Sequence, residues 1–528
     1  MSERVSKRES LWSLRWALII VGLTCLPYLV AWQIAPEGTQ YTGLLINHLD
    51  GESYYAKMQQ GVRGDWLFRL PFTSEPHDSA FVFTFYLALG HLAGWLGLAV
   101  PVVYHLARAA AGLFLLLVAY RFIARFFDRV PTRHVAFLLL GVSAGFGWLL
   151  APLGIVTADL WVAEGFTFLS LLVNPHFPLA IGLMLLLFLS VLDTLQVGGA
   201  QGTRLPTPRI LGAAGLGLLL AVVQPFAVPI ALAVLGVYLA LLTWRERRLP
   251  WPEMLVGGAA LVAAAPIILY DLYVYRSNPA LAAWSAQNLT PSLPPWNYAL
   301  GYGLVLLLAL GGIVIALRRR ERSGLFLLAW VGSVAVLLYL PFALQRRFIT
   351  GLHVPLTILA ALGLEQIIWP RLQERRRSLV TGLLVGFTAL TSLFVPLVAV
   401  VGVAQGRAPL VMSGDEAAAC AWLRENSAWT DTVLAPPGSG HFVPAWAGNR
   451  VVYGHPFETI DAQTKEAEVT HFFSAKATAD ERRALLERYG VRYVLTLSAE
   501  IDLDAGSLGL TPVWRQGDAT LYRAGASP

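Results

Sequence analysis

The sequence predicts a polytopic α-helical membrane protein with a small α/β domain outside the membrane at its C-terminal end. Of the 528 residues, 56% are hydrophobic and 14% are charged, whereas soluble domains contain about 25% charged residues. The mean hydropathy is +0.59, and apolar runs recur up to about residue 405. Arginines cluster in short loops between these runs, as in cytoplasmic loops of membrane proteins. The net charge of +6 therefore reflects orientation, and we exclude a nucleic-acid partner.

The first apolar run, residues 11–34, is predicted to be a retained transmembrane helix. It is too long for the core of a signal peptide and lacks a small-residue cleavage site. The basic residues before it favour a cytoplasmic N-terminus. The loop that follows, residues 35–100, is then external and carries Asp50 at the membrane surface.

One apolar segment, residues 80–98, is predicted not to cross the membrane. Only an odd number of crossings can join the external loop to the arginine cluster at residues 121–133. One of the two runs at 80–98 and 101–127 must therefore stay on one side. We assign this role to 80–98, as a re-entrant or surface-lying helix, because its aromatic residues suit a membrane interface.

Further apolar runs complete about eleven crossings in a transmembrane domain of residues 1–405. They are predicted at residues 134–153, 177–197, 210–243 (a hairpin broken at Gln224-Pro225), 252–275, 298–317, 325–344, 353–369 and 378–405. A second acidic external loop spans residues 154–176.

From residue 406 to 528 the composition becomes that of a soluble domain. Helical periodicity occurs at 415–426 and 479–489, and short strands are predicted at 432–435, 450–453, 491–497 and 519–523. Gly-rich turns at 436–441 and 453–455 carry His441 and His455. These turns are either structural or face an acceptor molecule.

Several kinds of site are missing from the sequence. It has no phosphate-binding glycine loop, no nucleophile elbow and no zinc-type spacing. Cys25 and Cys420 provide neither a disulfide framework nor a cysteine metal site. Instead, polar residues gather on the external side: Asp50, Glu52, Glu75, His77, Asp78, Asp159, Glu164, His176, Arg346 and Arg347. This distribution suggests a site that is reached from outside and from the outer leaflet.

The first external loop resembles that of a known enzyme class. The succession consists of Asp50, Tyr54-Tyr55-Ala56, Gly61, Gly64-Asp65-Trp66, Pro71, Glu75-Pro76 and, in the next helix, Arg108. This order resembles the integral-membrane glycosyltransferases of the GT-C superfamily. Within it, the sequence is most similar to the bacterial protein mannosyltransferase, aminoarabinose transferase and rhizobial lipopolysaccharide transferase type.

The resemblance implies a sugar donor linked to a lipid phosphate, an inverting transfer and an acidic general base in the first external loop. It also implies a second acidic loop, which here contains Asp159 and Glu164. The mannosyltransferases have two adjacent acids, whereas Gly51 separates Asp50 from Glu52 here. We therefore assign the base role to Asp50 alone, and Glu52 either contributes to the site or is merely solvated.

Elementary chemistry supports the same assignment. Sugar transfer from a polyprenyl phosphate needs a base for the acceptor's proton and a cation to offset charge on the departing phosphate. Asp50 can supply the first. Arg346 and Arg347 can supply the second by bidentate pairing, or they are an interfacial pair whose charged ends reach the headgroups.

For several other candidate residues, a structural role is the alternative to a role in binding. Candidate donor- or substrate-binding residues are Glu52, Tyr54, Tyr55, Glu75, His77, Arg108 and His176. Arg108 lies within a helix, so it meets a carboxylate in a structural salt bridge or the lipid phosphate. His176 contacts a substrate or metal, or caps its helix. Asp159 and Glu164 are candidate ligands for a divalent cation (Mg²⁺, Mn²⁺ or Ca²⁺).

The sequence thus predicts a membrane enzyme that moves a sugar from a polyprenyl-phosphate carrier to an extracytoplasmic acceptor. The alternative is a non-catalytic scaffold or transporter that retains the fold. Replacement of Asp50 distinguishes the two, because a scaffold would tolerate it.

Overall fold

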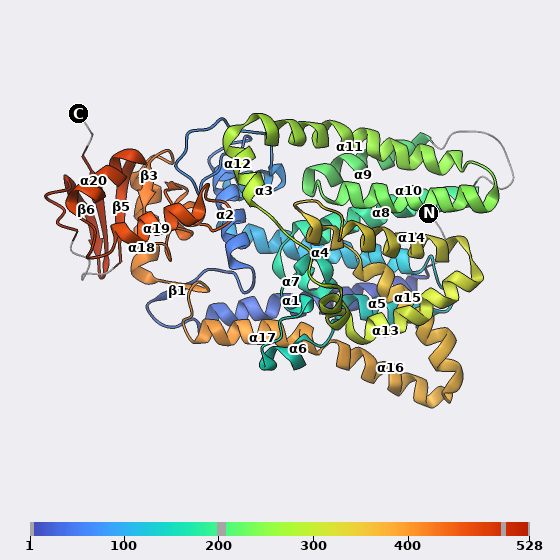
Figure 1. Cartoon of the computed structure of the whole chain (residues 1–528). Helices are drawn as coiled ribbons and strands as arrows, with labels where there is room; N and C mark the ends of the chain where they lie inside the picture. The colour runs from blue at the N-terminus through green and yellow to red at the C-terminus, as the bar shows by residue number, and fades with distance from the viewer. Residues whose placement is uncertain (1–4, 198–206, 498–502, 526–528) are drawn as a thin grey trace. The chain divides into compact units, whose positions relative to one another are not determined.

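The computed structural model describes residues 5–197, 207–497 and 503–525 (Figure 1). The chain divides into two compact units. The first unit comprises Met1–Pro27, His105–Tyr270 and Thr290–Val398. The second comprises Tyr28–Tyr104, Asp271–Leu289 and Ala399–Pro528. Residues 35–100, the loop predicted to be external, and the C-terminal segment therefore belong to the same unit.

Long apolar helices make this chain a multi-pass membrane protein. Within the described residues, eight helical segments are long and apolar enough to cross a bilayer. They are α1 (Lys7–Ile34), α4 (Val100–Ile123), α5 (Val130–Val142) with α6 (Gly147–Leu150), α8 (His176–Val197), α10 (Ala227–Glu246), α11 (Trp251–Ser277), α13 (Pro295–Arg319) and α16 (Glu374–Thr388) with α17 (Leu390–Ala404).

Shorter apolar helices occupy the remaining predicted crossings. They are α9 (Thr207–Val223), α14 (Arg322–Leu337) and α15 (His353–Gly363). The predicted break at Gln224-Pro225 separates α9 from α10. Every predicted crossing thus coincides with an apolar helix. The orientation of the N-terminus stays a prediction.

Helices of the first unit pack through small residues and an aromatic cluster. Gly312 of α13 and Gly363 of α15 lie so close to the facing backbone that an added Cβ would overlap the carbonyl oxygens of Leu359 and Leu308. Small residues at such crossings allow the close packing on which membrane helices depend. A separate aromatic cluster contains Phe122, Phe188, Tyr238, Phe326 and Trp330.

In the second unit, the first external loop contains two helices, α2 (His48–Val62) and α3 (Thr84–Leu96). Gly61 and Gly90 meet where they cross, with each glycine facing backbone of the other helix. Helix α3 has 13 residues, which gives about 20 Å at 1.5 Å per residue. A bilayer core is about 30 Å thick. This length agrees with the prediction that the segment 80–98 does not cross.

The C-terminal segment forms a five-stranded mixed sheet in the order β4-β3-β5-β7-β6. The strands are β3 (Thr432–Leu434), β4 (Arg450–Val451), β5 (Val491–Thr496), β6 (Leu510–Gln516) and β7 (Ala519–Ala524), and the helices are α18 (Gly414–Asn426), α19 (Ala462–Phe472) and α20 (Ala479–Arg488). All four predicted strands and both predicted helices are confirmed. The sequence analysis missed β6 and α19.

Two connections hold the first external loop to this sheet domain. Strand β1 (Thr39–Tyr41) pairs antiparallel with β2 (Val411–Ser413). Ala56 of α2 and Phe72 share one hydrophobic core with Val433 and Leu521 of the sheet. Because loop and sheet bury a common apolar surface, they form a single folded body.

Candidate functional site

Helix α2 presents Asp50 to solvent. The helix begins at His48 after Asn47, whose left-handed backbone (φ 51°, ψ 44°) reverses the chain. Asp50 lies in the first turn, where a carboxylate interacts favourably with the positive end of the helix dipole. It is exposed, whereas Glu52 is fully buried. Residues two positions apart face nearly opposite sides of a helix, so the two acids serve different environments.

Aromatic rings lie on the same face as Asp50. Tyr54, one turn further along α2, stacks on Tyr86 of α3 with ring centroids 4.3 Å apart and planes 5° apart. Asp50 interacts electrostatically with Tyr86. Tyr55 is instead buried and packs edge-on against Tyr104 and Trp446. The helix therefore separates a half-exposed tyrosine beside Asp50 from a buried one.

Three histidines, His48, His441 and His455, stand close enough to one another to interact electrostatically, and His48 and His455 also interact with Asp50. His455 Nδ1 accepts the backbone N–H groups of Phe457 (3.1 Å) and Glu458 (3.0 Å), so its neutral ring carries the proton on Nε2. Burial lowers the pKa of His455 and also lowers that of His441, to about 3. The Gly-rich turns thus place His455 near Asp50 and His441 near His455. A role of these turns toward an acceptor stays a prediction.

On its opposite face, α2 buries Glu52 beside a second acid. Glu52 is 0% exposed, and neither of its oxygens has a hydrogen-bond partner by geometry among the described residues. Burial raises the pKa of Glu52 well above the usual value, and the nearby carboxyl group of Glu416 raises it further. The indole of Trp446 acts in the opposite direction and lowers the pKa. Glu52 therefore lies in the core, where burial favours its neutral form. Its predicted part in donor binding stays a prediction.

Glu416 is expected to make the stability of the folded protein depend on pH. Burial raises its pKa from 4.5 to about 7, against hydrogen bonds from Ser439 and the Ser413 backbone. The folded state thus keeps a proton that the unfolded state loses above pH 4.5, so stability falls between about pH 4.5 and 7. Glu416→Gln carries no charge. We expect its thermal unfolding midpoint to rise relative to wild type across this window, by the equivalent of up to about 3 kcal/mol.

Glu425→Gln is the matched control, because Glu425 lies on the same helix with its side chain 71% exposed. Its midpoint should stay parallel to wild type from pH 5 to pH 8. If the unfolding midpoint of Glu416→Gln also stayed parallel to that of wild type from pH 5 to pH 8, the raised pKa of Glu416 would be contradicted.

A buried ion pair joins α2 to the C-terminal segment. The Lys57 ammonium donates to Glu458 Oε1 at 2.9 Å and to the hydroxyl of Ser53, which itself donates to Glu458. Lys57 is 1% exposed and lies 4.5 Å from the ring centroid of Phe83. Both charges are therefore compensated inside an aromatic enclosure.

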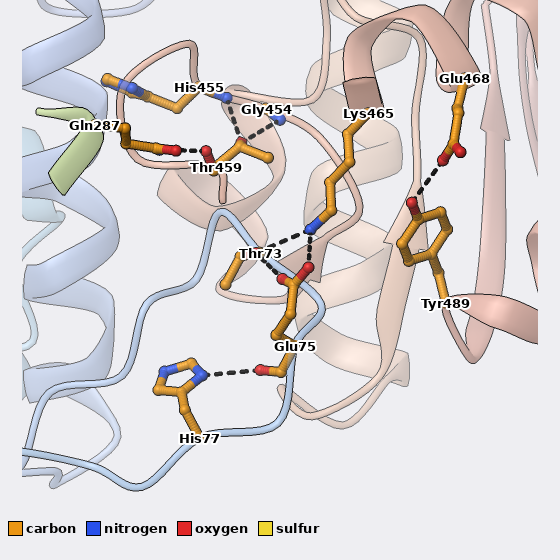
Figure 2. Close-up of polar contacts among 10 residues, drawn as sticks. All are labelled: Thr73, Glu75, His77, Gln287, Gly454, His455, Thr459, Lys465, Glu468 and Tyr489. Atoms are coloured by element: carbon orange, nitrogen blue, oxygen red, sulfur yellow. Dashed lines mark hydrogen bonds and ion pairs between the residues drawn. The ribbon is translucent and has the colours of Figure 1, made fainter. Parts of the chain in front are cut away.

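Glu75 and His77 shape the loop that follows α2 (Figure 2). Glu75 accepts hydrogen bonds from Lys465 and Thr73. Burial acts to raise the pKa of Glu75, but these bonds outweigh it and hold the pKa below the usual value. His77 Nδ1 donates to the Glu75 carbonyl (2.8 Å), and its Nε2 accepts from the Leu70 backbone (2.9 Å). Both residues are thus engaged in loop structure.

In the first unit, Asp159 organises a turn. Its carboxylate accepts the N–H groups of Gly145 and Gly147 at 3.0 Å and the hydroxyl of Thr157 at 2.5 Å. A side chain at Gly147 would collide with this carboxylate. Burial raises the pKa of Asp159, and these hydrogen bonds counteract it. The oxygens that a cation would need are already used by the protein.

Glu164 faces Arg346, with Oε1 and Nε 3.7 Å apart. Arg346 lies 4.4 Å over Trp161, and Arg347 lies 5.5 Å from the ring of Phe226. Both arginines belong to a short 3₁₀ turn, η4 (Gln345–Ile349), and are half-buried. In the part of the chain that the structure describes, no three His, Cys, Asp or Glu side chains form a group that could hold a metal. Asp159 and Glu164 do not fit a divalent-cation site there.

Arg108 and His176 lie in packed surroundings. The Arg108 guanidinium is 1% exposed and donates to the Leu171 carbonyl (2.7 Å) and the Thr24 hydroxyl (3.2 Å). It therefore ties α4 to α1 and to the helix α7 (Thr167–Val173). His176 is buried at the start of α8, with its ring 4.2 Å from that of Phe177. Contacts of either residue with a donor stay predictions.

The sequence matches no known protein-family profile and no curated protein. The fold, however, is shared with solved structures. An ArnT from Cupriavidus metallidurans, bound to undecaprenyl phosphate, superposes with a TM-score of 0.54 at 15% identity, covering 97% of this chain and 98% of that one. The chain has the GT-C fold.

Two other solved structures share this fold. The oligosaccharyltransferase of Archaeoglobus fulgidus gives a TM-score of 0.52 at 15% identity, over 91% of this chain and 69% of that one. A mycobacterial arabinofuranosyltransferase, AftD, gives 0.54 at 17% identity, over 97% of this chain and 42% of that one. The GT-C fold thus extends over nearly the whole chain, including its C-terminal segment.

Proposed function

We propose that this protein is a membrane glycosyltransferase that moves a sugar from a polyprenyl-phosphate donor to an extracytoplasmic acceptor, with inversion at the anomeric carbon. The observation that carries the proposal is the exposed Asp50 in the first turn of α2, within a chain of GT-C fold. The ArnT of the same fold was solved with undecaprenyl phosphate bound, which supports a donor of this class.

In the proposed reaction, Asp50 accepts the proton of the acceptor hydroxyl. As the acceptor oxygen bonds to the anomeric carbon, the bond from that carbon to the donor phosphate oxygen breaks on the opposite side. Polyprenyl phosphate leaves with the bonding electrons. Exposure of Asp50 suits this role because an acceptor can reach it, whereas the buried Glu52 cannot be reached in the same way.

Arg346 and Arg347 are proposed to bind the donor phosphate. Planar guanidinium groups pair bidentately with phosphate oxygens. Arg346 is held between Glu164 and the Trp161 ring, so it is oriented before a donor arrives. The described residues place no carboxylate within ion-pair distance of Arg347, which leaves its charge for a ligand.

Donor binding tests the proposal. Native mass spectrometry of the purified chain in nanodiscs should detect bound undecaprenyl phosphate after this lipid is added. Arg346→Gln with Arg347→Gln should reduce the bound fraction at least tenfold, because two charge-assisted contacts are lost. Arg375→Gln with Arg376→Gln is the matched control, since both of these arginines are exposed on α16.

Donor turnover completes the test. Purified protein supplied with polyprenyl-phosphate sugars and a cell-envelope extract should release free polyprenyl phosphate. If the Arg346/Arg347 double variant retained the lipid as well as the Arg375/Arg376 control does, Arg346 and Arg347 would not be the residues that bind the donor phosphate. Lipid binding without turnover of any donor would favour the scaffold reading.

A further inference from the structure

A small open pocket lies in the second unit, at the turn that follows α2. Its volume is about 250 Å³, below the roughly 300–1,000 Å³ of pockets for drug-sized ligands. Its lining includes Gln60, Asp65, Trp66, Arg69, Ser79 and Trp429. A pocket of this size suits one small ring and excludes a lipid chain. Asp50 and the arginines of the proposed donor site are not among its residues.

The pocket walls are fixed by hydrogen bonds and stacking. The Gln60 side chain makes two bonds of 2.9 Å with the backbone of Arg69, one as donor and one as acceptor. Trp66 stacks on His91 with ring centroids 4.0 Å apart and planes 21° apart. His91 Nε2 in turn lies 3.1 Å from the Asp65 carbonyl. The aromatic surface is therefore positioned in advance, which lowers the entropic cost of binding.

Trp66 nevertheless remains 47% exposed. An indole that is held in place and still half open to water offers its face to a ligand. The electron-rich face of an aromatic ring attracts groups with partial positive charge, and the C–H groups of a sugar ring are such groups. Asp65 and Ser79 add acceptor and hydroxyl groups for sugar hydroxyls.

The charge around the pocket is positive. Arg63 and Arg69 lie 4.9 Å and 5.4 Å from the ring of Trp429, and Arg450 is close enough to Arg69 to feel its charge. Asp65 is paired with Arg63 at 3.3 Å. Within the described ranges, no carboxylate lies within ion-pair distance of Arg69, which is exposed. This guanidinium is suited to a carboxylate or phosphate brought by a ligand.

We propose that this pocket binds a single sugar residue that carries an anionic group, either a carboxylate or a phosphate. The sugar ring packs on Trp66 and Trp429, and Arg69 pairs with the anion. Such a site recognises a charged glycan without taking part in bond formation, so it does not depend on the proposed transfer reaction.

Equilibrium binding to the purified full chain tests the site. The probes are glucuronic acid, glucose 6-phosphate, glucose and inorganic phosphate, and binding is followed by saturation-transfer NMR and calorimetry. We expect the two anionic sugars to bind at least tenfold more tightly than glucose, because one charge-assisted contact of about 1.4 kcal/mol corresponds to a factor of ten. Inorganic phosphate should bind at least tenfold more weakly than glucose 6-phosphate.

Three variants locate the binding. Arg69→Gln should weaken both anionic sugars at least tenfold and leave glucose unchanged, whereas Trp66→Ala and Trp429→Ala should weaken all three sugars. Arg515→Gln is the control, because it removes the same charge from an exposed arginine. Arg515 lies on β6, at the opposite edge of the sheet from β4, the strand of Arg450. Unfolding midpoints verify that each variant is folded.

Equal affinity for glucose and glucuronic acid, or no effect of Arg69→Gln, would overturn the anionic assignment. Inorganic phosphate binding as tightly as glucose 6-phosphate would reduce the site to a simple anion site and overturn the proposal. Absence of binding by every probe would do the same.

Discussion

Asp50→Asn is expected to abolish nearly all sugar transfer while leaving the donor bound. The amide keeps the size and shape of the carboxylate but cannot accept the acceptor's proton. General-base catalysis contributes roughly 10²- to 10⁴-fold, so the transfer rate should fall by about 10²-fold or more. Asp50 is exposed in the first turn of α2, so the substitution should not disturb packing. The rate is measured as polyprenyl phosphate released, and retained donor is measured by native mass spectrometry.

Two variants control this experiment. Asp78→Asn removes another exposed acid of the same loop and should retain full activity. Glu52→Gln replaces a buried acid, whose neutral form burial favours, by a neutral amide and should change the rate much less than Asp50→Asn. Near wild-type transfer by Asp50→Asn would move the base role to another acid. If no acid of either external loop were needed, the scaffold reading would hold.

The periodic parts of the fold could be read from the sequence. Apolar runs and arginine clusters predicted the long apolar helices, the break at Gln224-Pro225 and the short helix α3. These features depend on local hydropathy and on the number of crossings needed to join loops on opposite sides of the membrane. Both can be read from a single sequence. Strand β6 was missed because its burial follows no alternation: six of its seven residues are partly or fully exposed.

The contacts of the candidate site could not be read in the same way. Asp50 and Glu52 look equivalent in the sequence, and only the register of α2 places one in water and the other beside Glu416. Asp159 appeared suited to a metal, but the fold brings it to the N–H groups of Gly145 and Gly147. Local patterns show residue type and periodicity, whereas these partners depend on the final packing.

The Lys57–Glu458 pair is the clearest such case, since its members lie 401 positions apart in the chain. Neither side chain carries a motif. In the structure, burial acts to raise the pKa of Glu458. The Lys57 charge, together with His455 and the hydrogen bonds from Ser53 and Lys57, outweighs burial and lowers the pKa below the usual value. A lowered carboxyl pKa means stability that is present above about pH 4.5 and is lost as pH falls through the folded-state value.

Lys57→Met is therefore expected to destabilise the second unit by about 3–5 kcal/mol near pH 7, because it leaves the Glu458 carboxylate buried without its counter-ion. Lys57 is 1% exposed, and the rings of Phe83, Phe68 and Tyr54 around it keep water away. The loss should appear as a lower unfolding midpoint and as faster proteolysis of the C-terminal segment. The gap to wild type should narrow at acid pH, where wild type also loses the pair.

A double-mutant cycle separates the charge from the packing. Lys57→Met combined with Glu458→Gln removes both charges and should recover most of the lost stability, since a buried ion pair can be replaced by neutral groups of similar volume at little net cost. Lys476→Met is the control, because Lys476 is exposed in the same unit. If the double variant were as unstable as the sum of its two single variants, the charges would act independently. The buried pair would then not be what holds α2 to the C-terminal segment.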